Sequence, residues 1–117
     1  MVDNVSRDAA FLLHQAAERL YHCVLQVLAL YSPKSHRIIF LRSQAERLAP
    51  ELIEIWPRND RFAKRSFSRL DRAYVGARYS PAYEITNEEL AWLNERVAHL
   101  QGLVERICLA RLEGKDA

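Results

Sequence analysis

The sequence has few of the residues that interrupt helices, since only three of its 117 residues are Gly and four are Pro. So few helix breakers argue against a fold built from many short strands and turns. Half of the residues are hydrophobic, which excludes an intrinsically disordered segment. The length is typical of one domain, and we therefore predict a single folded unit over residues 1–117.

Cysteine and the common cofactor motifs are equally scarce. Cys23 and Cys108 are too few for a disulfide framework, and we interpret them as free thiols in a reducing compartment. The sequence has no HExxH, Gly-rich phosphate loop or GxSxG motif, so we expect no metal or other cofactor. It also shows no signal-peptide pattern and no run of the ~18 hydrophobic residues that a membrane span needs. We therefore expect a cytoplasmic protein.

The net charge is only +2, but the positive charges are unevenly distributed. Between residues 58 and 78, six Arg and one Lys stand against two Asp, and such a patch sets the local potential better than the total does. Arg61, Arg65, Arg69 and Arg72 recur at helical spacing and share one face. Because Arg side chains match phosphate oxygens, this stripe predicts a phosphate-binding surface. The alternative is a solvated helix face paired with acidic neighbours.

Hydrophobic residues recur every three or four positions and predict four long helices. The first covers residues 5–31, and its second half, CVLQVLALY, is hydrophobic nearly all round, which predicts a central or interfacial position. The second begins near His36 with Ser35 as N-cap and ends at Pro50, where a short helix, ELIEIW, begins. The third covers residues 61–78, after an Asp60 cap.

The fourth helix covers residues 87–113. Thr86 and Glu89 have the spacing of a capping box at its start, and Gly114 follows its end. The expected fold is therefore all-α: an up-down four-helix bundle with a short extra helix. We expect two copies to pair as a homodimer through the first or the fourth long helix, because small bundles gain stability by pairing.

Three short elements follow one another in an order that resembles the HEPN domain family. They are QAAER at residues 15–19, PKSH at residues 33–36 and ARYSPAY at residues 77–83. They are similar to the family's QxAEK-like element in the first helix, its Lys-Thr-His-like turn and its ARYP-like element before the last helix. The resemblance covers nearly the whole chain, and it is closest to the HEPN half that accompanies a minimal nucleotidyltransferase.

This resemblance implies a helical bundle that dimerises and has a groove associated with nucleotides or RNA. It also implies a nucleotidyltransferase domain or protein as partner, in a toxin–antitoxin system or in one fused chain. HEPN ribonucleases carry an Arg and, four to six residues later, a His near the start of the last helix. Here that helix offers only Arg96 and His99, while Arg7 and His14 have the spacing but lie in the first helix. This departure argues against a ribonuclease.

The turn before the second helix carries Lys34, His36 and Arg37. Unpaired backbone N–H groups at a helix N-terminus favour an anion, which makes this turn a candidate for binding nucleotide or RNA. The alternative for His36 is a cap or hinge contact between helices. We expect the other histidines at surface or rim positions of helices, namely His14, His22 and His99.

The loop before the last helix offers Arg78, Tyr79 and Tyr83 as further binding residues. The rings can stack on bases while the guanidinium holds a phosphate. The alternative is that the loop packs onto the end of the bundle and a Tyr hydroxyl bonds to the backbone.

These observations leave three functional hypotheses. In the one we adopt, the chain is a non-catalytic module that binds a nucleotide or RNA, or docks a nucleotidyltransferase. In the second, it is a metal-independent ribonuclease whose catalytic pair is His36 and Arg78. In the third, it is a structural dimerisation module. Nucleotidyl transfer needs carboxylates on a sheet, so that chemistry would belong to another domain or chain.

Overall fold

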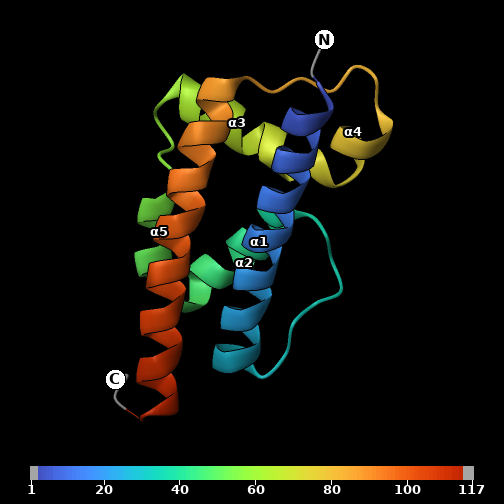
Figure 1. Cartoon of the computed structure of the whole chain (residues 1–117). Coiled ribbons are helices and arrows are strands. Elements are labelled where there is room, and N and C mark those ends of the chain that lie inside the picture. Colours follow the sequence, from blue (N-terminus) through green and yellow to red (C-terminus); the bar gives the residue numbers. More distant parts are fainter. Residues whose placement is uncertain (1–2, 115–117) are drawn as a thin grey trace.

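The computed structural model describes residues 3–114, which form an all-α bundle without a strand. The elements are α1 (Asn4–Ala29), α2 (Ile38–Leu48), the short 3₁₀ helix η1 (Pro50–Ile55), α3 (Arg61–Asp71), α4 (Ala73–Tyr79) and α5 (Asn87–Leu112). The two long helices, α1 and α5, lie side by side and run in the same direction (Figure 1). The predicted all-α bundle with a short extra helix is confirmed.

The core lies where α1 and α5 meet α2, η1 and α3. Its largest fully buried side chains include Tyr21, Ile38, Leu41, Leu52, Ile55, Trp56, Leu70, Leu93 and Leu100. The indole N–H of Trp56 donates to the hydroxyl of Tyr21 at 2.7 Å, so both buried polar groups are satisfied. Burial also raises the pKa of Tyr21.

Helices α3 and α5 begin at the cap residues that the sequence predicts. The Thr86 hydroxyl accepts from the Glu89 amide at 3.0 Å, and the Glu89 carboxylate accepts from the Thr86 amide at 2.9 Å. Asp60 caps α3 by accepting from the Phe62 amide at 3.0 Å. The predicted capping box and the Asp60 cap are therefore confirmed.

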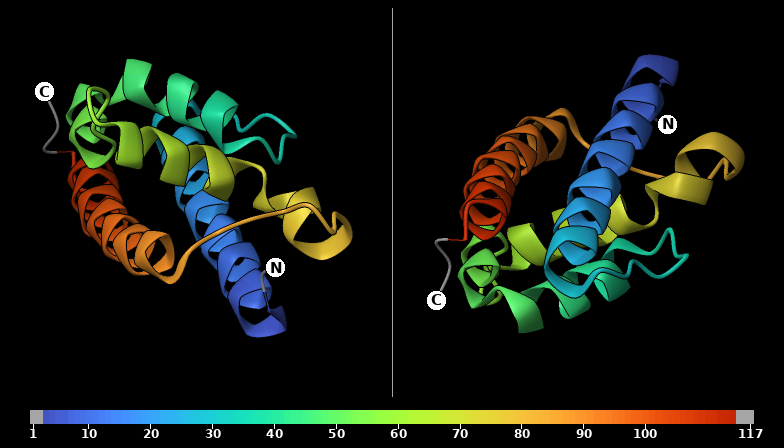
Figure 2. Two further views of the ribbon diagram at one scale, coloured as in Figure 1. Left: turned by 90° about the horizontal axis from the view of Figure 1, so that it is seen from above. Right: turned by 90° about the horizontal axis from the view of Figure 1, so that it is seen from below.

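The prediction of one continuous third helix over residues 61–78 is wrong, because the chain turns at Arg72 and α4 stands away from α3 (Figure 2). The Asp71 carboxylate is directed away from its own helix. It accepts from the Ile39 amide at 3.0 Å and pairs with the Arg37 guanidinium at 2.8 Å. The N-cap predicted at Ser35 is also wrong, because α2 begins at Ile38 and the amide of Ile39 in its first turn donates to Asp71 of α3.

The hydrophobic second half of α1 is only partly in the core. Val24 and Leu25 are buried, whereas Cys23, Leu30 and Tyr31 are exposed. The face of this segment that carries Val24 and Leu25 therefore has the predicted central position. That the exposed face lies in an interface with another chain remains a proposal. Within residues 3–114, no helix has the length and hydrophobicity to cross a membrane.

Candidate functional site

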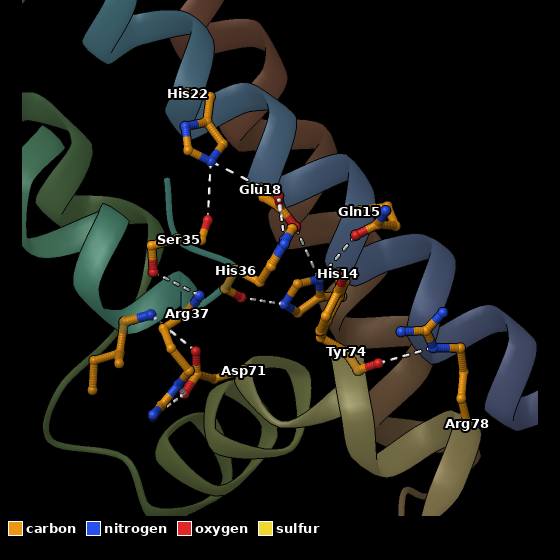
Figure 3. Close-up of polar contacts among 11 residues, drawn as sticks. His14, Gln15, Glu18, His22, Ser35, His36, Arg37, Asp71, Tyr74 and Arg78 are labelled. Carbon is orange, nitrogen blue, oxygen red and sulfur yellow. Dashed lines mark hydrogen bonds and ion pairs between the residues drawn. The ribbon is translucent and has the colours of Figure 1, made fainter. Parts of the chain in front are cut away.

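The QAAER and PKSH elements of the motif meet at one carboxylate, that of Glu18 (Figure 3). The shortest approach is from His36 in the turn before α2, whose Nδ1 lies 3.0 Å from Glu18 Oε2. His14 Nδ1 and His22 Nε2, both from α1, lie 3.6 and 3.8 Å from the same carboxylate. Tyr74 from α4 closes the group by stacking on His36.

Helical geometry explains how α1 contributes three of these groups. His14, Glu18 and His22 are separated by four residues each and therefore lie along one face of the helix. This spacing is a signal in the sequence that becomes informative only when the three residues are considered together. The rim position predicted for His22 is confirmed, and that of His99 is also confirmed, since both are partly exposed.

The surface or rim position predicted for His14 is wrong, because its side chain is fully buried. Its Nε2 donates to the backbone carbonyl of His36 at 2.8 Å, which ties the turn to α1. Burial lowers the pKa of His14, because the charged imidazolium would lose its hydration. The neutral ring therefore supports the turn and does not face a ligand.

His36 is the exposed member of the group, with 56% of its side chain accessible to solvent. Its ring stacks on Tyr74, with centroids 4.1 Å apart and planes 7° from parallel. The Glu18 carboxylate accepts a hydrogen bond from Nδ1 at 3.0 Å, which orients the ring. No described residue bonds to Nε2. The imidazole is thus oriented on one side and open on the other.

Arg78 extends this surface along α4. Its guanidinium carbon lies 4.5 Å from the ring centroid of Phe11, 4.8 Å from that of Tyr74 and 4.9 Å from that of Tyr79. Its Nε donates to the Tyr74 carbonyl at 3.0 Å. Ring faces attract the cation and hold it in place, while its position on the surface leaves it accessible to an anion.

The end of α4 is held in place by Arg7 from α1. Its Nη1 donates to the carbonyls of Ala77 at 3.1 Å and Ser80 at 2.9 Å, at the C-terminal end of the helix. A cavity of about 500 Å³ opens beside this anchor, and Arg78 and Tyr79 contribute to its lining. The ARYSPAY segment is therefore positioned next to a hollow.

The comparison with known proteins identifies a protein family for this chain. The sequence matches the family model of the HEPN domain over residues 3–107. The chain belongs to the HEPN domain family. The matched region contains all three sequence elements, QAAER, PKSH and ARYSPAY. Comparison with curated proteins gave no match. A HEPN domain is consistent with a helical module related to nucleotides or RNA.

In this HEPN domain the predicted Arg stripe is divided. Arg65 Nε and Arg69 NH1 each lie 2.7 Å from an oxygen of Glu89, which is fully buried at the start of α5. Burial alone would raise the pKa of Glu89, but hydrogen bonds from the Thr86 amide and both guanidinium groups outweigh it and lower the pKa. Arg65 and Arg69 thus match the paired alternative rather than an open phosphate surface.

The two ends of the stripe, Arg61 and Arg72, are exposed, and no carboxylate within residues 3–114 pairs with them. Lys34 is likewise exposed beside His36 without a described partner. Arg37 pairs with Asp71 at 2.8 Å but remains largely exposed. The candidate cations therefore differ in whether a carboxylate already neutralises them. Lys34, Arg61 and Arg72 have no carboxylate partner among the described residues and are the most available to a phosphate.

The two tyrosines of the last loop also differ. Tyr79 is 69% exposed, as a stacking residue requires. Tyr83 is buried, and its hydroxyl donates to the Arg69 carbonyl at 2.8 Å, while burial raises its pKa to about 12. The stacking role predicted for Tyr83 is wrong, because its ring packs inside the HEPN domain. Among the described residues, no three His, Cys, Asp or Glu side chains are placed to hold a metal.

Proposed function

We propose that this HEPN domain is a non-catalytic module that binds a nucleotide or RNA, and that single-stranded RNA fits its surface best. The observation that carries the proposal is the meeting of His36, Tyr74 and Arg78 on one surface. We name this surface, together with Lys34 and Tyr79, the His36 surface. It combines exposed planar groups with cations, which is the chemistry that single strands use to bind proteins.

Stacking supplies the first part of the expected affinity. Alanine substitution of a stacking ring costs about 1–3 kcal/mol per base, and Tyr79 and His36 are the most exposed rings of this surface. The cations supply the second part, because Arg78 and Lys34 attract phosphates. Arg78 is already oriented by rings on α1 and α4, so less conformational entropy is lost when it binds.

The proposed partner is a minimal nucleotidyltransferase, in a toxin–antitoxin-like system. Nucleotidyl transfer requires metal-binding carboxylates, usually on a sheet, and residues 3–114 contain neither a strand nor a metal-binding group of this kind. In this proposal the HEPN domain holds the RNA, and the partner carries out the transfer.

A metal-independent ribonuclease is the second candidate, and the pair formed by Glu18 and His36 favours it. A carboxylate that fixes Nδ1 leaves Nε2 able to take a proton from a ribose 2′-hydroxyl. Arg78 would then stabilise the negative charge that develops on the phosphate. The absence of the family's Arg–His spacing from α5 is the reason we place this candidate second.

A binding experiment tests the proposal, and a cleavage experiment on the same RNA separates it from the ribonuclease. A fluorescently labelled, unphosphorylated single-stranded RNA is titrated with the wild type, His36→Ala and Tyr79→Ala, with His99→Ala on α5 as the matched control. We expect Tyr79→Ala to weaken binding about tenfold, which corresponds to about 1.4 kcal/mol, and the control to bind like the wild type. Equal affinity for all four proteins would overturn the proposal.

The same RNA is then incubated with the wild type and His36→Ala in the presence of a chelator. We expect it to remain intact, as a binding module requires. Cutting by the wild type that disappears in His36→Ala would contradict the non-catalytic proposal and support the ribonuclease.

A further inference from the structure

A second pocket, with a volume of about 500 Å³, is lined by residues of α2 and α3, including the ion pair of Arg37 and Asp71. The turn after η1 closes one end of it, where Pro57 and Arg58 contribute to the wall. Its volume lies within the range of about 300–1,000 Å³ that is typical of small-molecule sites. We name it the α2–α3 pocket.

The lining of this pocket is strongly basic. It contains five cations, which are Arg37, Arg42, Arg58, Lys64 and Arg72. Two carboxylates offset them: Asp71 pairs with Arg37, and Glu46 is shared by Arg42 and Arg58. Positive charge therefore remains in excess.

The excess is carried by Lys64 of α3 and by Arg72, the C-cap residue of that helix. Lys64 and Arg72 are exposed, and no carboxylate among residues 3–114 pairs with either. Arg72 Nε donates to the Ser68 carbonyl at 3.4 Å, and Ser68 lines the pocket between these two cations. Lys64, Ser68 and Arg72 follow one another at intervals of four residues, so they lie along one face of α3 and its C-cap, and all three line the pocket.

Part of the wall is hydrophobic. Ile39 is half exposed, and Trp56 and Phe67 also line the pocket, with the Arg42 guanidinium carbon 4.4 Å from the centroid of the Phe67 ring. A ligand that fits must therefore carry negative charge at one end and a flat or hydrophobic group at the other.

We propose that the α2–α3 pocket binds a phosphate monoester of nucleotide size. A monoester carries up to two negative charges, which match the unpaired Lys64 and Arg72, whereas a phosphodiester carries one. Inorganic phosphate would leave the hydrophobic wall uncovered. The ligand is either a free nucleoside monophosphate or the phosphorylated end of an RNA, because both present the same monoester beside a sugar and a base.

The test measures the binding of AMP, adenosine and inorganic phosphate by calorimetry. The wild type is compared with Lys64→Gln/Arg72→Gln, and the matched control is Arg47→Gln/Arg61→Gln, which removes the same charge from exposed positions outside the pocket. All four side chains are exposed, so both double variants should fold. We expect AMP to bind the wild type and the control alike, and to bind the pocket variant at least tenfold more weakly. Adenosine and phosphate should bind at least tenfold more weakly than AMP.

A second arm distinguishes the two sources of the monoester. A short RNA with a 5′-phosphate is compared with the same RNA carrying a 5′-hydroxyl, on the same three proteins. If the 5′-phosphate strengthens binding and the pocket variant abolishes that gain, an RNA end is a ligand. If AMP alone binds, the ligand is a free nucleotide. If neither monoester distinguishes the pocket variant from the control, the proposal is wrong.

This proposal does not depend on the His36 surface. His36→Ala and Tyr79→Ala should leave AMP binding unchanged, and Lys64→Gln/Arg72→Gln should still bind the unphosphorylated RNA within about threefold of the control, since the two lost charges act on it only at long range. Failure of one site is therefore distinguishable from failure of the other.

Discussion

Glu89 is a fully buried carboxylate at the start of α5, and three donors compensate for its burial: the Thr86 amide and the guanidinium groups of Arg65 and Arg69. We predict that Glu89→Gln lowers the free energy of unfolding by about 2 kcal/mol, because the amide keeps only one acceptor oxygen for the two guanidinium groups and loses the negative charge that attracts both. Urea denaturation at neutral pH measures this change.

The control for this prediction is Glu84→Gln. Glu84 is 76% exposed, and its carboxylate lies as far as 3.7 Å from the Arg69 guanidinium, so this ion pair is weak. Loss of the charge should change the free energy of unfolding by less than about 0.5 kcal/mol. Equal effects of the two substitutions would show that burial of the Glu89 charge does not matter for stability.

His14 makes the stability of the bundle depend on pH. Its pKa in the folded state is lowered from 6.5 by burial, so the unfolded chain binds more protons between the two values. The contribution is therefore complete above about pH 6.5 and is lost as the pH falls through the lower folded pKa. We predict that His14→Gln makes the free energy of unfolding less dependent on pH below 6.5. Parallel pH profiles for the wild type and His14→Gln would contradict this.

At the scale of elements, the local signals were sufficient for the starts of α3 and α5 and insufficient for the start of α2 and for the break in the third helix. The Thr86–Glu89 capping box lies within four residues and could be read directly from the sequence. The break at Arg72 depends on Asp71, whose partners at the start of α2 lie more than thirty residues away. Propensity and periodicity contain no information about such a contact. The stacking of Tyr74 on His36 could not be predicted for the same reason.

Two helical glycines provide a matched prediction. Around Gly102 in α5, no atom lies within 4 Å of the position that an added methyl group would occupy, so Gly102→Ala should raise the free energy of unfolding by about 0.5–1 kcal/mol through helix propensity. At Gly76 in α4 the same methyl group would lie 2.8 Å from Cδ1 of Tyr83, a buried ring. Gly76→Ala should therefore destabilise the protein despite its better propensity. Thermal denaturation measures both, and stabilisation by both would contradict the packing of Tyr83 under α4.

At the scale of the whole molecule, one end of the bundle exposes large hydrophobic side chains. Leu30, which is 82% exposed, and Tyr31 follow the end of α1, and Leu109 and Leu112 lie in the last turns of α5. Both helices end at the same end of the molecule (Figure 1). Exposed hydrophobic groups gathered in this way are typical of an interaction surface.

We propose that two copies pair through this end, as a homodimer. Light scattering from micromolar to millimolar concentrations should give twice the mass of one chain, and Leu109→Glu/Leu112→Glu should give a monomer. Val75→Glu, at an exposed position on α4, is the control and should remain a dimer. A wild type that stays monomeric throughout would contradict the proposal.

The sequence identified individual residues of the candidate site but did not predict which of them lie close together. His36 and Arg78 were identified because they lie in recognisable elements of the sequence. Glu18 and Tyr74, which bring them together, became visible only when α1, the turn and α4 were placed in space. Arg65, Arg69 and Tyr83 were expected to face a ligand, but their partners come from the start of α5 or the backbone of α3.

The central claim, that RNA binds on the His36 surface, is tested most directly by amide chemical shifts during titration with an unphosphorylated hexauridylate. We predict that shifts concentrate in residues 33–37 and 74–81, which carry the exposed His36, Arg78 and Tyr79, and on the neighbouring face of α1. Residues at the far end of α5 should not respond. Shifts that are absent at saturating RNA, or confined to the end of the bundle near Leu112, would contradict the account.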